Sequence, residues 1–234
     1  GGNTVRSELP SASTPLIAPG AGGAIGALLR ASGTIDTGAG GVSSLGYSTL
    51  TRYRGKVMNY QYFAAQLGVL ASTPQLTILD AKPTPGANFY YKSGNSSVEG
   101  SGAWNILSGE RYLIFIDGDL DIKKNITVNN GGFLAFVVSG DVRVDPSVTT
   151  VEGLYLMNGN FVTLASRGTD TPLSVSGSVV AWGSVSLGRD LGAGNVSTPA
   201  ERFSYRPDLL VNMPETMKVF ALRWQEVVPG TFGN

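Results

Sequence analysis

The chain has no cysteine and no histidine, and only 15% of its 234 residues are charged. Without the first two residue types, structural zinc sites, thiol nucleophiles, Ser-His-Asp triads and haem ligation by histidine are all excluded. No disulfide holds the fold, so packing and hydrogen bonds must stabilise it. Calcium binding by oxygen ligands remains open, as does catalysis by carboxylate, Lys, Arg, Ser or Tyr side chains.

An excess of charge of either sign is also absent, because 17 Lys and Arg residues balance 17 Asp and Glu residues. Such a chain presents no electrostatic surface for nucleic acid or for an anionic membrane, so we expect neither as a partner. Copies of an uncharged chain repel one another weakly, which favours self-association into an oligomer or polymer. No apolar run approaches the length of about 18 residues that a membrane span requires.

Residues 1–50 form an arm rich in Gly, Ala, Ser and Thr, a composition that resembles a flexible linker. To become ordered, such an arm must pack on its own domain or dock on a neighbouring subunit. We expect docking, with the bulkier apolar residues of the arm inserted into a groove or along a strand edge of the neighbour. These subunit-docking residues are Leu16, Ile17, Ile25, Leu28 and Leu29.

Residues 51–88 are predicted to hold one short amphipathic helix followed by a Pro-rich connection. Within residues 55–68, the helical face is formed by Val57, Tyr60, Ala64 and Leu67, with Phe63 beside them. Gly68 follows where a left-handed C-cap residue is common.

An internal repeat dominates residues 89–195. Four segments, "IDGDLDI", "VSGDVRV", "MNGNFVT" and "AWGSVSL", share a glycine between apolar positions, at Gly118, Gly140, Gly159 and Gly183. A period of roughly 20 residues is typical of a solenoid. With an alternating strand before each glycine and a short strand after it, the pattern predicts a mainly β fold: a short single-stranded parallel β-helix. We expect glycine at the corners because a bend between strands often requires positive φ.

Stacking the repeat in register places Asp119 one strand spacing below Asp141, and Asp121 below Arg143, where a cross-strand salt bridge is expected. The two aspartates predict either a surface calcium site or a solvated ladder of Asx side chains that bond to corner backbone groups. An EF-hand loop is excluded, because Ile122 and Val128 stand where it needs Gly and Glu.

A β-helix enzyme acting on polysaccharide needs clustered acids or a base beside calcium. The positions before the repeat glycines are Asp117, Ser139, Asn158 and Trp182, which form no acid cluster, so we predict no enzyme. A binding module for glycans, using exposed aromatics such as Trp104 or Trp182, is the alternative.

Residues 196–234 leave the repeat and are rich in proline and bulky apolar residues. An open solenoid end exposes strand edges and core, and it must be covered to prevent uncontrolled stacking. The segment therefore predicts an end cap or a surface offered to a partner. Its residues for either role are Phe203, Tyr205, Leu209, Leu210, Phe220 and Trp224.

The stretch from "YLIFIDGDLDIKKNITVNNGGFLAFVVSGDVRV" to "FSYRPDLLVNMPETMKVFALRWQEVVPG", roughly the second half of the chain, resembles uncharacterised bacterial surface proteins often grouped with pilus-assembly-like proteins. A looser architectural analogy is with bactofilins, β-solenoids that polymerise end to end. The resemblance implies a β-solenoid at the cell surface and no catalytic residue.

The chain opens with "GGNTVRSELP", without an initiator Met, as expected of a mature exported chain or equally of a trimmed one. Together these observations predict an extracellular or cell-surface structural protein of a bacterium. We expect it to self-assemble into a filament or layer through its N-terminal arm.

Overall fold

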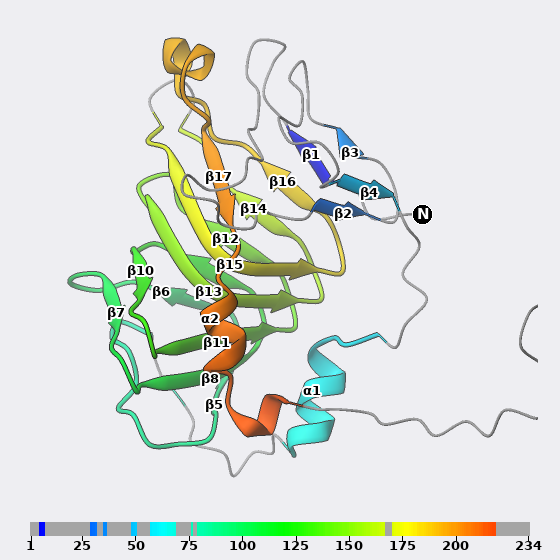
Figure 1. The fold of residues 1–234 in the computed structure, drawn as a ribbon, viewed down its shortest axis with the longest axis vertical. Coiled ribbons are helices and arrows are strands. Elements are labelled where there is room, and N and C mark those ends of the chain that lie inside the picture. The colour runs from blue at the N-terminus through cyan, green and yellow to red at the C-terminus, as the bar shows by residue number, and fades with distance from the viewer. Residues whose placement is uncertain are drawn as a thin grey trace, which may run out of the picture.

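In the computed structural model, residues 57–68, 76, 79–166 and 170–218 are described, together with the backbone of four short strands nearer the N-terminus. The fold is mainly β, and parallel strands stack as a β-solenoid of about five turns (Figure 1). The predicted fold class is therefore confirmed. A further turn precedes the four repeats, with Gly94 at its corner, and is the lowest turn of the coil.

One wall of the coil is a seven-stranded sheet, here called sheet A, built from the short strand that follows each glycine corner. From the lower end upward, its strands are β6 (Ser96–Val98), β9 (Leu120–Ile122), β12 (Val142–Val144), β14 (Phe161–Thr163), β16 (Val185–Leu187), β1 (Val5–Ser7) and β3 (Ile35–Asp36). The first five belong to the coil. The last two come from the predicted arm and extend the same sheet upward.

The opposite wall, sheet B, contains the longer strand of each turn. From the lower end its strands are β5 (Tyr90–Ser93), β8 (Arg111–Asp117), β11 (Phe133–Val138), β13 (Thr150–Met157), β15 (Leu173–Ala181) and β17 (Glu201–Ser204). A third short strand, β7 (Trp104–Ile106) and then β10 (Ile126–Val128), closes the lower turns, and β10 continues into the start of β13 through the Ile126–Val151 pair. A separate parallel pair is formed by β2 (Leu29–Ala31) and β4 (Ser48–Leu50).

Two apolar clusters form on the two faces of sheet B. The inner cluster fills the coil, because alternate residues of every strand point inward and are stacked turn upon turn, as in the column Ile114, Phe136 and Tyr155. The outer cluster arises because β11 is buried at all six positions, so its other face is apolar as well. Parallel sheets are commonly covered on both faces in this way.

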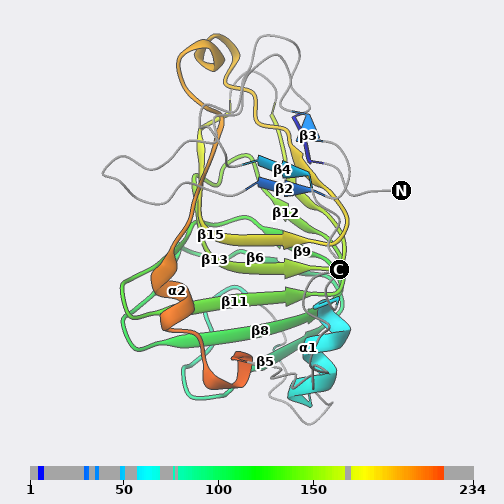
Figure 2. The ribbon, with the colours of Figure 1, turned by 45° about the vertical axis from the view of Figure 1, so that its right-hand side comes forward.

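Helix α1 (Tyr60–Leu67) covers part of that outer face (Figure 2). Asn59 caps its first turn by accepting from the Tyr62 N–H, and Gly68 ends it with φ of 61°. Tyr60 and Phe63 are buried, and the Tyr60 ring meets Phe115 edge-on with 6.0 Å between centroids. The predicted helix and its C-cap are confirmed, but the helix begins at Tyr60, because Asn59 caps it there, and Val57 of the predicted face precedes it and is 51% exposed.

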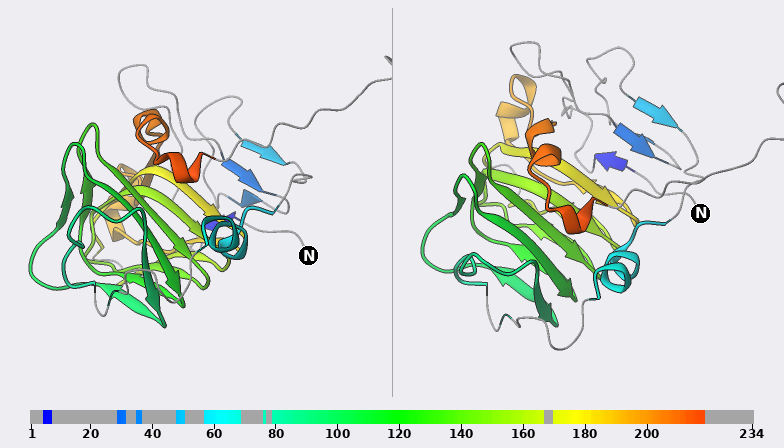
Figure 3. Two further views of the ribbon diagram at one scale, coloured as in Figure 1. Left: turned by 90° about the horizontal axis from the view of Figure 1, so that it is seen from below. Right: turned by 60° about the horizontal axis from the view of Figure 1, so that its bottom comes forward.

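The C-terminal segment differs from the expected end cap. After the short helix η1 (Gly192–Val196), strand β17 adds to the upper edge of β15, and α2 (Pro207–Val211) and η2 (Glu215–Met217) then descend along the outer face of sheet B. Seen from below, α1 and α2 both lie outside the coil (Figure 3). The physical reason is the second apolar face of sheet B, which needs a cover that the sequence pattern did not reveal.

Of the predicted cap residues, Leu209 of α2 is buried against β15, where a Cβ added at Gly177 would lie 3.1 Å from its Cδ1, and it joins the inner cluster by contact. Phe203 is half-buried against the same cluster, with its ring 6.4 Å from that of Phe161. Tyr205 is half-buried, while Leu210 is 45% exposed. Phe220 and Trp224 lie outside the described residues, as do Leu16, Ile17, Ile25 and Leu28 of the arm. Only the backbone of Leu29 is described, at the start of β2.

Candidate functional site

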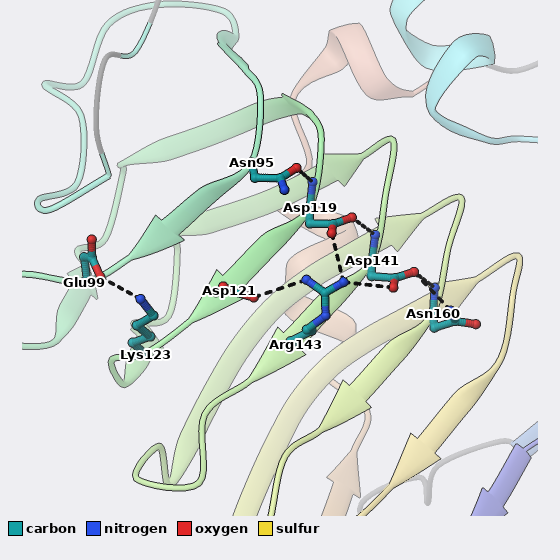
Figure 4. A network of polar contacts seen from close by, with 8 residues as sticks. All are labelled: Asn95, Glu99, Asp119, Asp121, Lys123, Asp141, Arg143 and Asn160. Carbon is teal, nitrogen blue, oxygen red and sulfur yellow. Dashed lines mark hydrogen bonds and ion pairs between the residues drawn. The ribbon is translucent and has the colours of Figure 1, made fainter.

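The corner between sheets B and A carries one polar residue after each glycine: Asn95, Asp119, Asp141, Asn160 and Ser184. Each side-chain oxygen of the first four accepts a hydrogen bond from the backbone N–H of the residue above it, at 2.8 to 2.9 Å. Figure 4 shows this Asx ladder along the corner, from Asn95 to Asn160. The Asx interpretation of the sequence is therefore confirmed, because each rung satisfies a backbone donor of the next turn.

The ladder explains the repeat glycines, and it corrects the reason that the sequence suggested. Of the four, only Gly118 has a positive φ. A Cβ added at Gly140 would lie 2.1 Å from Asp119 Oδ1, and one added at Gly159 would lie 2.1 Å from Asp141 Oδ1. Glycine is thus required here because the ladder side chain of the turn below approaches the backbone too closely for any Cβ.

Arg143 supplies the positive charge beside the ladder. Its Nη2 lies 2.8 Å from Asp119 Oδ2 and 3.2 Å from Asp141 Oδ2, and its Nη1 lies 3.6 Å from Asp121 Oδ1. The expected Asp121–Arg143 pair is present, at a distance too long for a hydrogen bond. A guanidinium that two ladder carboxylates share offsets the repulsion between them.

The titration of Asp119 reflects these contacts. The Asp141 backbone N–H and, after it, the Arg143 guanidinium stabilise the carboxylate and hold the pKa of Asp119 below its usual value, against the opposing effect of burial. The hydrogen bond to Asp119, followed by the nearby carboxylates, raises the pKa of Arg143. The site is thus charged and paired at neutral pH.

For calcium, Asp119 and Asp141 were the predicted ligands. The structure does bring these two carboxylates together, but the cation between them is the Arg143 side chain. Among the described residues, no group of three or more acidic side chains is arranged to hold a metal ion. The ladder and Arg143 account for the positions of both aspartates without a metal.

The expected aromatic surface is corrected in part. Trp104 is 3% exposed and packs inside the coil, 6.0 Å from the Phe136 ring, because it occupies an inward position of β7. Trp182 is half-buried, and its Nε1 donates to the Met58 carbonyl just before α1. Asn158 binds the same helix, accepting from the Tyr60 N–H. These two corner residues therefore hold α1 in place.

A buried polar cluster at the upper end has no counterpart in the repeat. The Arg189 side chain is fully buried, and its Nη1 and Nη2 donate to four backbone carbonyls at 2.7 to 3.0 Å: those of Asp145, Pro146, Val148 and Thr171. Burial lowers the pKa of Arg189. This arginine ties the end of the coil to a bend two turns below.

Glu201 lies beside Arg189 and is 2% exposed. Its Oε1 accepts from Thr163 Oγ1 at 2.7 Å and from the Arg189 N–H at 2.8 Å, and burial raises its pKa. Sequence reasoning missed both charged residues, because neither recurs with the period of the repeat. It also missed Asn95, although the signal was present: Asn95 follows Gly94 as Asp119 follows Gly118.

Strand edges at the two coil ends form the remaining candidate surface. β17 pairs with only the first half of β15, from Leu173 to Ser176. Within the described part of the chain, residues 177–181 have no strand partner above them. At the lower end, the pairing of the β6 edge among the described residues is an isolated bridge between Leu79 and Val98.

Comparisons with protein-family models, with curated proteins and with solved structures gave no match. Among the helices described in the structure, none is long and apolar enough to cross a membrane.

Proposed function

We propose that this chain is a structural protein of the bacterial cell surface, which assembles with copies of itself into a filament or layer. The observation that carries the proposal is the upper edge of β15 at residues 177–181, which no strand of the described residues covers. Unpaired parallel strand edges are templates for another chain. The bacterial cell-surface location rests on the resemblance noted in the sequence, and the zero net charge favours close approach of copies.

The open edge has a defined polarity. In β15 the N–H groups of Ser174 and Trp182 donate downward, to the carbonyls of Thr149 and Met157. The unbroken register with β13 means that the even-numbered residues between them also bond downward. The odd-numbered residues Gly177, Val179 and Ala181 therefore direct their N–H and C=O groups upward, where a strand of a second copy would pair.

Electron microscopy and light scattering on one sample of the protein test the proposal. We expect filaments or sheets. A clean monomer near 24.4 kDa at high concentration would overturn self-assembly, and a glycan array would then examine the binding-module alternative.

A pair of variants then tests the edge itself. Val179→Pro removes one upward N–H and leaves the hydrogen bonds to β13 intact, so it should abolish or shorten the assemblies. Val179→Ala, the matched control, trims the same side chain but keeps the N–H, and should assemble like the parent. Equal assembly of both variants would show that this edge is not the contact.

A further inference from the structure

Strand β1 occupies the place of an additional coil turn in sheet A. Val5, Arg6 and Ser7 pair in parallel with Val185, Ser186 and Leu187 of β16. Strand β14 pairs with the same three residues from the other side. The three-residue length and the parallel direction are those of the coil strands, so β1 satisfies the upper edge of β16 as a next turn would.

The connectivity of β1 is nevertheless unlike that of a coil strand. Strands β9, β12, β14 and β16 are each joined to the next by one turn, so the coil itself forces them to be neighbours. Val5 lies 180 positions before its partner Val185. Strand β1 is joined to α1 by the chain between Ser7 and Tyr60. At about 3.3 Å per extended residue, this connection can reach farther than the height of five turns spaced by about 4.8 Å. Nothing in this connectivity restricts β1 to the β16 of its own molecule.

We propose that in the assembly β1 of one copy pairs with β16 of the neighbouring copy. The partner is a second copy of this chain, and the inference rests on the proposed self-assembly. Each copy donates one strand and accepts one, which is a heterologous contact, and such a contact extends into an open chain when its rotation does not close a ring. A three-residue strand makes few hydrogen bonds, and water replaces each of them on release, so the separation of β1 from its own β16 costs little free energy.

The balance between the two pairings follows from concentration. A flexible connection gives β1 an effective concentration in the millimolar range at its own β16. Pairing within one molecule therefore dominates in dilute solution. Exchange between copies competes with it where the edge of β15 holds the copies together, because the β16 of the neighbour is then as close as the copy's own.

Cysteine cross-linking decides between the pairings, since the chain has no cysteine of its own. Arg6 and Ser186 are Cα partners, and adjacent strands are spaced within the range of about 4.4–6.8 Å that a disulfide bridges. Arg6→Cys and Ser186→Cys are made as separate variants, mixed before assembly, sedimented as assemblies and oxidised. We expect covalent dimers that contain one copy of each variant on a non-reducing gel.

The double variant R6C/S186C provides the second readout, and V162C/S186C is its matched control. Val162 and Ser186 are Cα partners within the coil, so the control must form only an internal disulfide if the coil is native. In sedimented assemblies R6C/S186C should form covalent multimers. Assemblies in which it forms only an internal bond, with no dimers in the mixed sample, would overturn strand exchange and leave the proposed function intact. Absence of any sedimenting assembly from the parent chain would overturn both.

Discussion

The glycine corner and the upper end of the coil satisfy polar groups in opposite ways. At the corner, one short side chain per turn accepts one backbone N–H of the next turn, and the arrangement repeats from Asn95 to Ser184. At the upper end, the single side chain of Arg189 satisfies four carbonyls from two separate segments. At the corner, each ladder residue therefore contributes a similar small share of the stabilisation. At the upper end, one residue contributes most of it.

The largest effect is therefore expected at Arg189. Arg189→Met keeps much of the buried volume but leaves the carbonyls of Asp145, Pro146, Val148 and Thr171 without this donor. We expect a loss of about 3–5 kcal/mol in the free energy of unfolding, as when one partner of a buried charged network is removed. Urea unfolding measures it. Arg202→Met, at an exposed arginine of β17, is the control and should change stability by about 0.5 kcal/mol or less.

A glycine of the corner should come next. Gly159→Ala forces a Cβ to within 2.1 Å of Asp141 Oδ1 and 2.8 Å of the Gly140 carbonyl oxygen. Relief of that overlap displaces one rung, and we expect a loss of about 1–3 kcal/mol in the same assay. Gly194→Ala is the comparison, because its Cβ meets nothing closer than 3.3 Å. Equal effects of the two substitutions would refute the steric account of the repeat.

Loss of one ladder side chain should lower the free energy of unfolding less than substitution of a corner glycine does. Asp141→Ala leaves the Asn160 backbone N–H and its Nδ2 without their acceptor, which should lower stability by about 1–2 kcal/mol. Asp141→Asn keeps the accepting oxygen and removes only the charge, so its loss should stay near 0.5 kcal/mol. If Asp141→Asn were as damaging as Asp141→Ala, the ion pair with Arg143 would outweigh the ladder.

Acid should weaken the corner through Asp119. Since the folded state lowers the pKa of this carboxyl from its model-peptide value of 3.8, its contribution is present above that pH and is lost as the pH falls through the folded pKa. We expect Asp119→Asn to reduce the drop in thermal midpoint between pH 5 and about pH 3 by a small, measurable amount. If Asp119→Asn left the drop in thermal midpoint at acid pH unchanged, the inferred pairing of Asp119 would be contradicted.

The smallest effect is expected from chelation. Because Arg143 neutralises the carboxylates, EDTA should leave the thermal midpoint unchanged, and added calcium should not raise it. A rise with calcium that Asp141→Asn abolishes would restore the metal-site interpretation of the corner.

The same contrast explains how much the sequence predicted. The coil and its Asx corner were accessible because glycine followed by Asn, Asp or Ser recurs once per turn. Helix α1 was accessible because apolar spacing and Gly68 agree. Arg189 was not, because a residue used once has no period, and its value depends on carbonyls more than 40 positions away.

The outer face of sheet B was missed for a different reason. The run "FLAFVV" was interpreted through its inward residues alone, although an unbroken apolar strand indicates burial on both faces. Trp104 was expected at the surface, yet the alternation of β7 places it inward together with Ile106. In both cases the apolar pattern indicated which side chains are buried. The sequence did not show how many faces of each strand are covered by other elements.

The segments that run along the outside of the coil determine how it would respond to force. Hydrogen bonds between turns lie along the coil axis, so axial tension would separate one pair of turns at a time, and the weakest would yield first. Arg206, which bonds the carbonyl of Val128 and the carboxylate of Glu152, and α1, held by Asn158 and Trp182, attach to different turns from the side. These lateral attachments bear part of the applied force beside the hydrogen bonds between turns. Under tension the turns would therefore not separate one at a time, because several contacts would have to break together.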